Sequence, residues 1–123
     1  MNEKLVILNG KEILIDEECV DLVLYFNDIG LKTFMCCSGH GEQNFRIIFD
    51  NLVTDEDIAI FLKDKVNKYN HSMFLGKFVK WARVRSGEIV QNWMYAAETV
   101  SFAEVDYRRL KEYDLIKKDG KYE

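Results

Sequence analysis

Residues 32–41 read Lys32-Thr33-Phe34-Met35-Cys36-Cys37-Ser38-Gly39-His40-Gly41. The first part of this stretch has the β-branched and aromatic residues of a strand, and the second part has the small and polar residues of a loop. The segment at 45–49 is apolar again and predicts a second strand. We therefore expect a β-hairpin whose loop carries thiols, a hydroxyl and an imidazole within a few residues.

The residues before this hairpin predict another hairpin and a helix. Apolar runs at 5–8 and 13–15 flank Asn9-Gly10, a dipeptide suited to a tight turn. Acidic residues then open a helix expected over residues 17–29, with apolar side chains at helical spacing and Gly30 as its C-terminal stop. These elements lead directly into the strand of the opening stretch.

Two helices and a long hairpin are expected after the opening stretch. The segment from Thr54 to Asp57 has the form of a capping box, which begins a helix that ends near residue 69. Residues 74–85 and 88–97 predict two strands joined by a turn at residues 86–87. A second capping box, at 101–104, opens a helix that ends near residue 113.

The predicted order of elements is ββαββαββα. It contains a split β-α-β-β-α-β arrangement, whose crossovers place both helices on one face of a largely antiparallel sheet. We therefore predict an α+β fold, a two-layer sandwich in a single domain over residues 1–116. The charged tail at 117–123 is expected to fray.

Charge and cysteine content restrict the partners and the compartment. The chain has 123 residues, a formal charge of −4 and a sequence pI near 5.3, which argues against tight nonspecific binding to a nucleic-acid backbone. No segment is apolar over the ~20 residues that a membrane span requires. The three cysteines are an odd number, and Cys36 and Cys37 would pair only under strain. We expect free thiols in a reducing cytoplasm, no membrane association and no cofactor.

The glycines of the opening loop favour an anion-binding site. Gly39 and Gly41 permit backbone conformations in which successive amide N–H groups converge. Ser38 adds a hydroxyl and His40 an imidazole, and both donate hydrogen bonds to phosphate or carboxylate. The predicted ligand-binding set therefore contains Cys37, Ser38, Gly39, His40 and Gly41, and the alternative is an ordinary glycine loop.

The long hairpin predicts the remaining contacts of this ligand. It carries the widest aromatic and basic surface in the chain, formed by Trp81, Arg83, Arg85, Trp93 and Tyr95. Aromatic rings stack on bases and arginines contact phosphates, so the anionic ligand that suits both regions is a nucleotide. The alternative is that these rings form sheet core or an interface of a homo-oligomer.

Other chemistries stay open at this stage. Zinc needs four ligands, and alternation sends Cys36 and Cys37 to opposite faces, so we expect no metal site with His40. A nucleotide- or RNA-modifying enzyme would use His40 as acid or base and Cys37 as nucleophile, but no third group orients the imidazole. We expect binding without catalysis, and the second alternative is a protein-binding module acting through residues 74–97.

The opening stretch also resembles motifs of known families. Gly30 and Thr33 in a G-x-x-T pattern, followed by C-C-S-G-H at residues 36–40, look like a motif of small, mostly uncharacterised proteins of bacteriophages and their hosts. This resemblance implies a phage protein in the host cytoplasm, with an anti-defence role as a binder that sequesters a nucleotide signal of host immunity. Residues 37–39 are also distantly similar to the Ser-Cys-Ser-Gly-Arg motif of the wybutosine-synthesising tRNA methyltransferase family, in which Arg stands at the position of His40. That likeness implies a strand–loop site and not methyl transfer.

Overall fold

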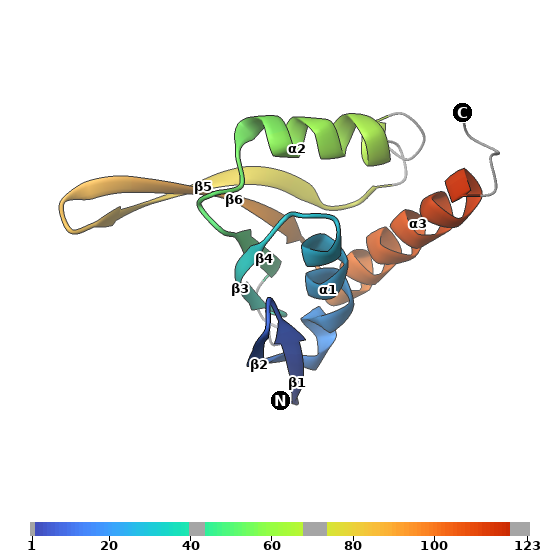
Figure 1. The fold of residues 1–123 in the computed structure, drawn as a ribbon, viewed down its shortest axis with the longest axis horizontal. Helices are drawn as coiled ribbons and strands as arrows, with labels where there is room; N and C mark the ends of the chain where they lie inside the picture. Colours follow the sequence, from blue (N-terminus) through green and yellow to red (C-terminus); the bar gives the residue numbers. More distant parts are fainter. Residues whose placement is uncertain (1, 40–43, 68–73, 119–123) are drawn as a thin grey trace.

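The computed structural model describes residues 2–39, 44–67 and 74–118. Figure 1 shows a long β-hairpin projecting from a body of helices and shorter strands. The strands are β1 (Glu3–Leu8), β2 (Lys11–Asp16), β3 (Thr33–Cys37), β4 (Phe45–Phe49), β5 (Lys77–Arg85) and β6 (Glu88–Ala97). The helices are α1 (Val20–Asp28) after a 3-10 turn at Glu17–Cys19, α2 (Asp55–Phe61) continuing as a π-helical segment at Leu62–Asn67, and α3 (Val100–Lys118). The predicted α+β class and the order ββαββαββα are confirmed.

Four strands form one antiparallel sheet in the order β3-β4-β6-β5, and β1 and β2 form a separate two-stranded sheet. β4, α2 and β5 make a split β-α-β unit, because β6 lies antiparallel between the two strands. The larger predicted arrangement also places the strand before α1 in this sheet, but β6 takes the position beside β4 and β2 pairs with β1 (Figure 1). β2 pairs with β1 because the two strands are adjacent in the sequence. Asn9 and Gly10, at φ 52° and 81°, close the tight turn between them at little cost in loop entropy.

One hydrophobic core joins the three helices to a single face of the larger sheet. The ring centroid of Phe26 in α1 lies 5.1 Å from that of Phe49 in β4, 5.8 Å from Phe61 in α2 and 5.9 Å from Tyr95 in β6. Leu110 of α3 is fully buried in the same core. The layer of helices on one face of the sheet, which the sequence predicts, is therefore present.

The predicted N-terminal cap of α2 is confirmed and that of α3 is displaced, while the predicted end of α2 near residue 69 lies outside the described residues. Thr54 Oγ1 accepts a hydrogen bond from the Asp57 amide at 3.1 Å, and the Asp57 carboxylate accepts one from the Thr54 amide at 3.0 Å. At α3, the Thr99 hydroxyl accepts the bond from the Phe102 amide at 3.1 Å, so the cap lies two residues before the predicted one. Buried Tyr113 extends the packing, and α3 continues to residue 118, into the predicted tail.

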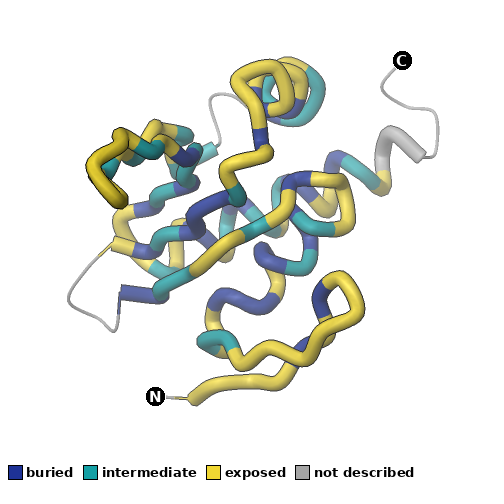
Figure 2. The backbone as a smooth tube through the Cα atoms, turned by 60° about the vertical axis from the view of Figure 1, so that its left-hand side comes forward, coloured by how far each residue is buried: buried dark blue, intermediate teal, exposed yellow. Residues whose placement is uncertain are grey.

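The second face of the four-stranded sheet, here called the open face, carries a different set of side chains. Its central residues are Met35, Cys37, Arg46, Ile48, Trp81 and Met94. Met35 is 49 % exposed. Figure 2 shows that the N-terminal hairpin is also largely exposed. Both the open face and the β1–β2 hairpin are therefore accessible to solvent.

Candidate functional site

The two adjacent cysteines face opposite sides of the sheet, as strand alternation predicts. Cys36 lies opposite Ile47 of β4 and packs against the hydrophobic core, whereas Cys37 lies opposite Arg46 on the open face. The third thiol, Cys19, is fully buried. The interaction of its thiol with that of Cys36 lowers the pKa of Cys36 and, together with burial, raises the pKa of Cys19.

The described part of the opening loop is already engaged by the protein. The Ser38 amide donates to the Asp16 carboxylate at 3.1 Å, and the Gly39 amide donates to the Cys37 sulfur at 3.4 Å. Ser38 is buried and borders a cavity of about 250 Å³ that the three acidic residues at 16–18 also line. Their negative charge opposes a phosphate, so we expect weak anion binding at this end of the loop. The predicted ligands at positions 40 and 41 lie outside the described residues.

The five ligand residues predicted on the long hairpin do not come together. Trp81 and Arg83 lie on the open face, whereas Trp93 and Tyr95 face the helices. Arg85 is exposed at the end of β5, beside the turn of the hairpin. The reason is the register, because side chains alternate along each strand and directly paired residues share a face. The structure therefore divides the predicted aromatic surface into two.

Contacts within the protein hold the two aromatic residues on the helix side. Trp93 Nε1 donates to Asp55 Oδ1 at 2.9 Å, and the ammonium of Lys80 lies 5.4 Å from the centroid of the Trp93 ring. The hydrogen bond from Lys80, with the one from Trp93, lowers the pKa of Asp55. Tyr95 is fully buried, and its hydroxyl donates to the Asp106 carboxylate at 2.7 Å. For Tyr95, the alternative of a core residue is correct.

Asp106 is a buried acidic residue that was not predicted from the sequence. Its carboxylate accepts hydrogen bonds from the backbone amides of Leu75 and Gly76 and from the Tyr95 hydroxyl, each at 2.7 Å. Burial raises the pKa of Asp106 in spite of these three donors, and burial also raises the pKa of Tyr95. These three bonds join α3 to the residues before β5 and to Tyr95 of β6.

The open face carries one arginine beside two aromatic rings, a group here called the Arg83 cluster. The Cζ atom of Arg83 lies 4.7 Å from the ring centroid of Trp81 and 5.6 Å from that of Phe34. Arg83 Nη1 donates to Asn92 Oδ1, and Asn92 Nδ2 donates to the Phe49 carbonyl at 2.8 Å. Asn92 is only 4 % exposed, so a buried amide fixes the position of the guanidinium. Neither Phe34 nor Asn92 was predicted.

A cavity of about 160 Å³ lies next to Trp81 on the open face. Its lining residues are Met35, Cys36, Cys37, Arg46, Ile48, Trp81 and Met94. Ile48 is buried and forms an apolar floor, while Arg46 and Trp81 add a cation and an aromatic ring. Arg46 was not predicted, although its place between Phe45 and Ile47 puts it on the face opposite these core residues.

Two further properties concern only the residues that the structure describes. Among them, no group of three or more His, Cys, Asp or Glu side chains is arranged to hold a metal ion. None of the described helices combines the length and the apolar character needed to cross a membrane.

The fold and the open face define a small α+β domain with helices on one side of an antiparallel sheet and an arginine–aromatic cluster on the other. A family model described as YoqC prophage protein matches residues 7–119, and the chain belongs to the YoqC prophage protein family. Membership confirms the phage origin that the resemblance of the opening stretch implies. No curated protein and no solved structure matches the sequence significantly.

Proposed function

We propose that this prophage protein binds a nucleotide on the open face of its four-stranded sheet. The observation that carries the proposal is the Arg83 cluster, in which a guanidinium is held against the Trp81 and Phe34 rings beside an apolar cavity. This position keeps Trp81, Arg83 and Cys37 of the predicted ligand set. It replaces the loop amides by Arg46 as a contact for the anionic group.

The base is expected to lie against Trp81 and over the cavity. Ile48 and Met94 provide an apolar floor there, and Met35 adds a flexible apolar side chain at the same cavity. Stacking of a base on an aromatic side chain contributes about 1–3 kcal/mol. An apolar floor beside one ring favours a flat heterocycle over an aliphatic ligand.

The phosphate is expected to contact Arg46 and Arg83. Both side chains belong to the open face, on β4 and β5. A guanidinium binds phosphate through two parallel hydrogen bonds, each worth about 1.5–3 kcal/mol when charge-assisted. The negative formal charge of the whole chain does not oppose this contact, because the acidic cavity beside Ser38 is a different surface.

Binding without turnover fits the residues that line the cavity. None of its described lining residues is a carboxylate or an imidazole, and the thiols of Cys36 and Cys37 are the titratable groups there besides Arg46. A phage protein that holds a nucleotide can act by removing it, and we propose that the ligand is a nucleotide signal of host immunity in the host cytoplasm. The alternative is a nucleotide- or RNA-modifying enzyme that uses His40 and Cys37. Turnover that is abolished in His40→Ala, with binding retained, would favour this alternative.

Isothermal titration calorimetry with linear and cyclic nucleotides tests the proposal. We expect one saturable ligand for the wild-type protein, and about tenfold weaker binding for Trp81→Ala and for Arg83→Ala, equivalent to about 1.4 kcal/mol each. Arg85→Ala is the matched control, since this arginine of the same strand lies at the exposed end of β5, and its affinity is expected to stay within about twofold. Absence of binding across the whole set, or equal effects of the two arginine variants, contradicts the proposal.

A further inference from the structure

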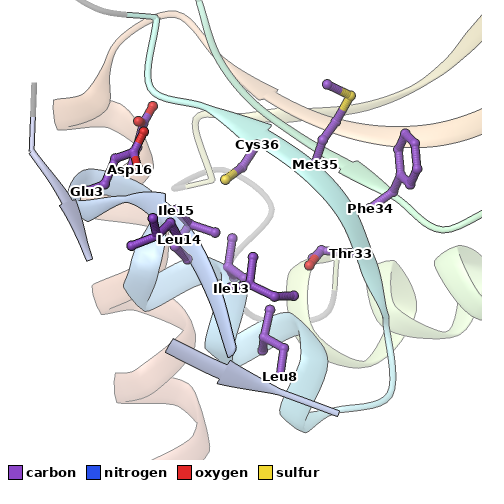
Figure 3. A pocket seen from close by; sticks show the side chains of 11 residues that line it. Glu3, Leu8, Ile13, Leu14, Ile15, Asp16, Thr33, Phe34, Met35 and Cys36 are labelled. Atoms are coloured by element: carbon purple, nitrogen blue, oxygen red, sulfur yellow. The ribbon is translucent and has the colours of Figure 1, made fainter. Parts of the chain in front are cut away.

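A second candidate site lies between the two sheets, where two edge strands face each other. β2 is paired on one side with β1, and β3 is paired on one side with β4, so each strand has one edge without a strand partner in the described chain. A groove of about 300 Å³ separates these edges. Figure 3 shows Ile13 of β2 and Thr33 of β3 on its two sides, with the carboxylates of Glu3 and Asp16 at one end.

The hairpin register shows which backbone groups of β2 point into this groove. The two-residue turn makes Leu8 and Lys11 a directly paired couple that exchanges both backbone hydrogen bonds. The N–H and C=O groups of every second residue, Leu14 among them, therefore point away from β1 and toward β3. The Asp16 amide has the same orientation. β2 thus directs the backbone groups of Glu12 and Leu14 into the groove, whereas on the β3 side the Thr33 amide already donates to Asn27 Oδ1 at 3.3 Å.

One end of the groove is closed and acidic. The Asp16 carboxylate accepts the hydrogen bond from the Ser38 amide and joins the end of β2 to the end of β3. Glu3 is the cross-strand partner of Asp16, so two carboxylates lie side by side at this end. The rest of the lining includes the apolar side chains of Leu8, Ile13 and Val23. This combination is complementary to an apolar segment with a lysine or arginine at one end.

We propose that the groove takes up an extended segment of a partner protein, apolar in sequence and with a basic residue at one end, which adds a strand between β2 and β3. Such a segment would join the two sheets through its backbone hydrogen bonds, while its side chains provide the specificity. The occupant must have both edges free. β5 of a second copy does not meet this condition, because one of its edges is already paired with β6.

Selection from a library of random peptides, each long enough to cover the six residues of β2, tests this proposal on the full-length protein. We expect the enriched peptides to lack proline, to be apolar, and to carry lysine or arginine at one end. A synthetic copy of one enriched peptide is then titrated by fluorescence anisotropy. Hydrogen exchange is expected to slow at Leu14 and along β3 when this peptide is bound.

The decisive variant is Leu14→Pro, which removes a donor facing the groove while sparing the hydrogen bonds to β1. Its matched control is Leu5→Pro, because Leu5 is the cross-strand partner of Leu14 and its amide points away from both β2 and the groove. We expect loss of peptide binding for Leu14→Pro and retention for Leu5→Pro. Melting curves of both variants report whether each is folded.

A conservative pair of substitutions keeps the test valid if Leu14→Pro does not fold. Glu3→Gln with Asp16→Asn retains the shape of the acidic end and removes its charge. We expect about tenfold weaker binding of the basic peptide, which corresponds to about 1.4 kcal/mol. If no peptide is enriched, if the folded Leu14→Pro variant binds as well as the wild type, or if the charge-neutral variant binds the peptide unchanged, the proposal is wrong.

Discussion

Replacing Tyr95 with phenylalanine removes one hydroxyl from the buried Asp106 site and leaves the ring in place. The Tyr95 ring lies 5.9 Å from Phe26 and 6.1 Å from Phe45, and phenylalanine retains both contacts. The lost hydrogen bond ends on a buried carboxylate, and bonds of this kind contribute about 1.5–3 kcal/mol. Because Asp106 Oδ2 keeps its bond from the Gly76 amide, we expect the free energy of unfolding to fall by about 2 kcal/mol. For a domain of this size the Tm falls by about 8 °C.

Urea denaturation followed by tryptophan fluorescence measures this loss. Tyr107→Phe is the matched control, because the Tyr107 ring packs 6.4 Å from Tyr25 and its hydroxyl has no hydrogen bond to the described residues. We expect the control to lose less than about 0.5 kcal/mol. Equal losses for the two variants would refute the role of the Tyr95 hydroxyl.

The effect of Tyr95→Phe also depends on pH. The hydroxyl stabilises the ionised carboxylate and so lowers the pKa of Asp106 relative to the variant, although burial keeps this pKa above its ordinary value of 3.8. The stability that this hydrogen bond adds to the ionised carboxylate is present above the pKa of Asp106 and is lost as the pH falls through this pKa. The stability difference between the wild type and Tyr95→Phe therefore shrinks on acidification. A difference that grows at acid pH would contradict this reasoning.

Two further predictions concern packing and thiol reactivity. Gly76→Ala is expected to destabilise the protein by about 3 kcal/mol in the same urea assay, because an added Cβ would come within 2.4 Å of the buried Tyr95 ring; an unchanged midpoint would contradict this. Iodoacetamide is expected to modify Cys36, which lines a cavity and has a lowered pKa, much faster than fully buried Cys19. Mass spectrometry of peptides from the native protein measures both rates, and preferential labelling of Cys19 would overturn this order.

Local signals predicted most of the secondary structure. Asn9-Gly10 and the capping box at Thr54 act over a few residues, and both are found where the sequence indicates. The two faces of the long hairpin also follow from its turn, although the prediction did not use the cross-strand pairing that this turn fixes. A two-residue turn at 86–87 pairs Trp81 with Asn92, so Trp93 belongs to the opposite face.

Contacts between distant residues were not predicted, because many strands compete for each position in a sheet. The hydrogen bond between Asp16 and Ser38 joins residues 22 positions apart. Because of it, the Ser38 amide of the opening loop already donates to a carboxylate of the protein and not to a ligand. Asp106 gave a clearer signal. It lies three residues after Ala103 and four before Leu110, both buried, so helical spacing places its carboxylate on the core face of α3. Only the identity of the three groups that donate hydrogen bonds to Asp106 could not be predicted from the sequence.

The composition of the open face is the strongest reason to expect an occupant there. An antiparallel sheet that faces water on one side normally alternates apolar and polar residues, yet this face presents Met35, Ile48, Trp81 and Met94 in the described chain. A two-fold interface between copies would cover them, but it would bring the arginines of both copies into one buried layer, where like charges repel. A nucleotide covers the same apolar floor and places its negative charge beside Arg46 and Arg83. Charge therefore favours the nucleotide over a second copy as the occupant of this face.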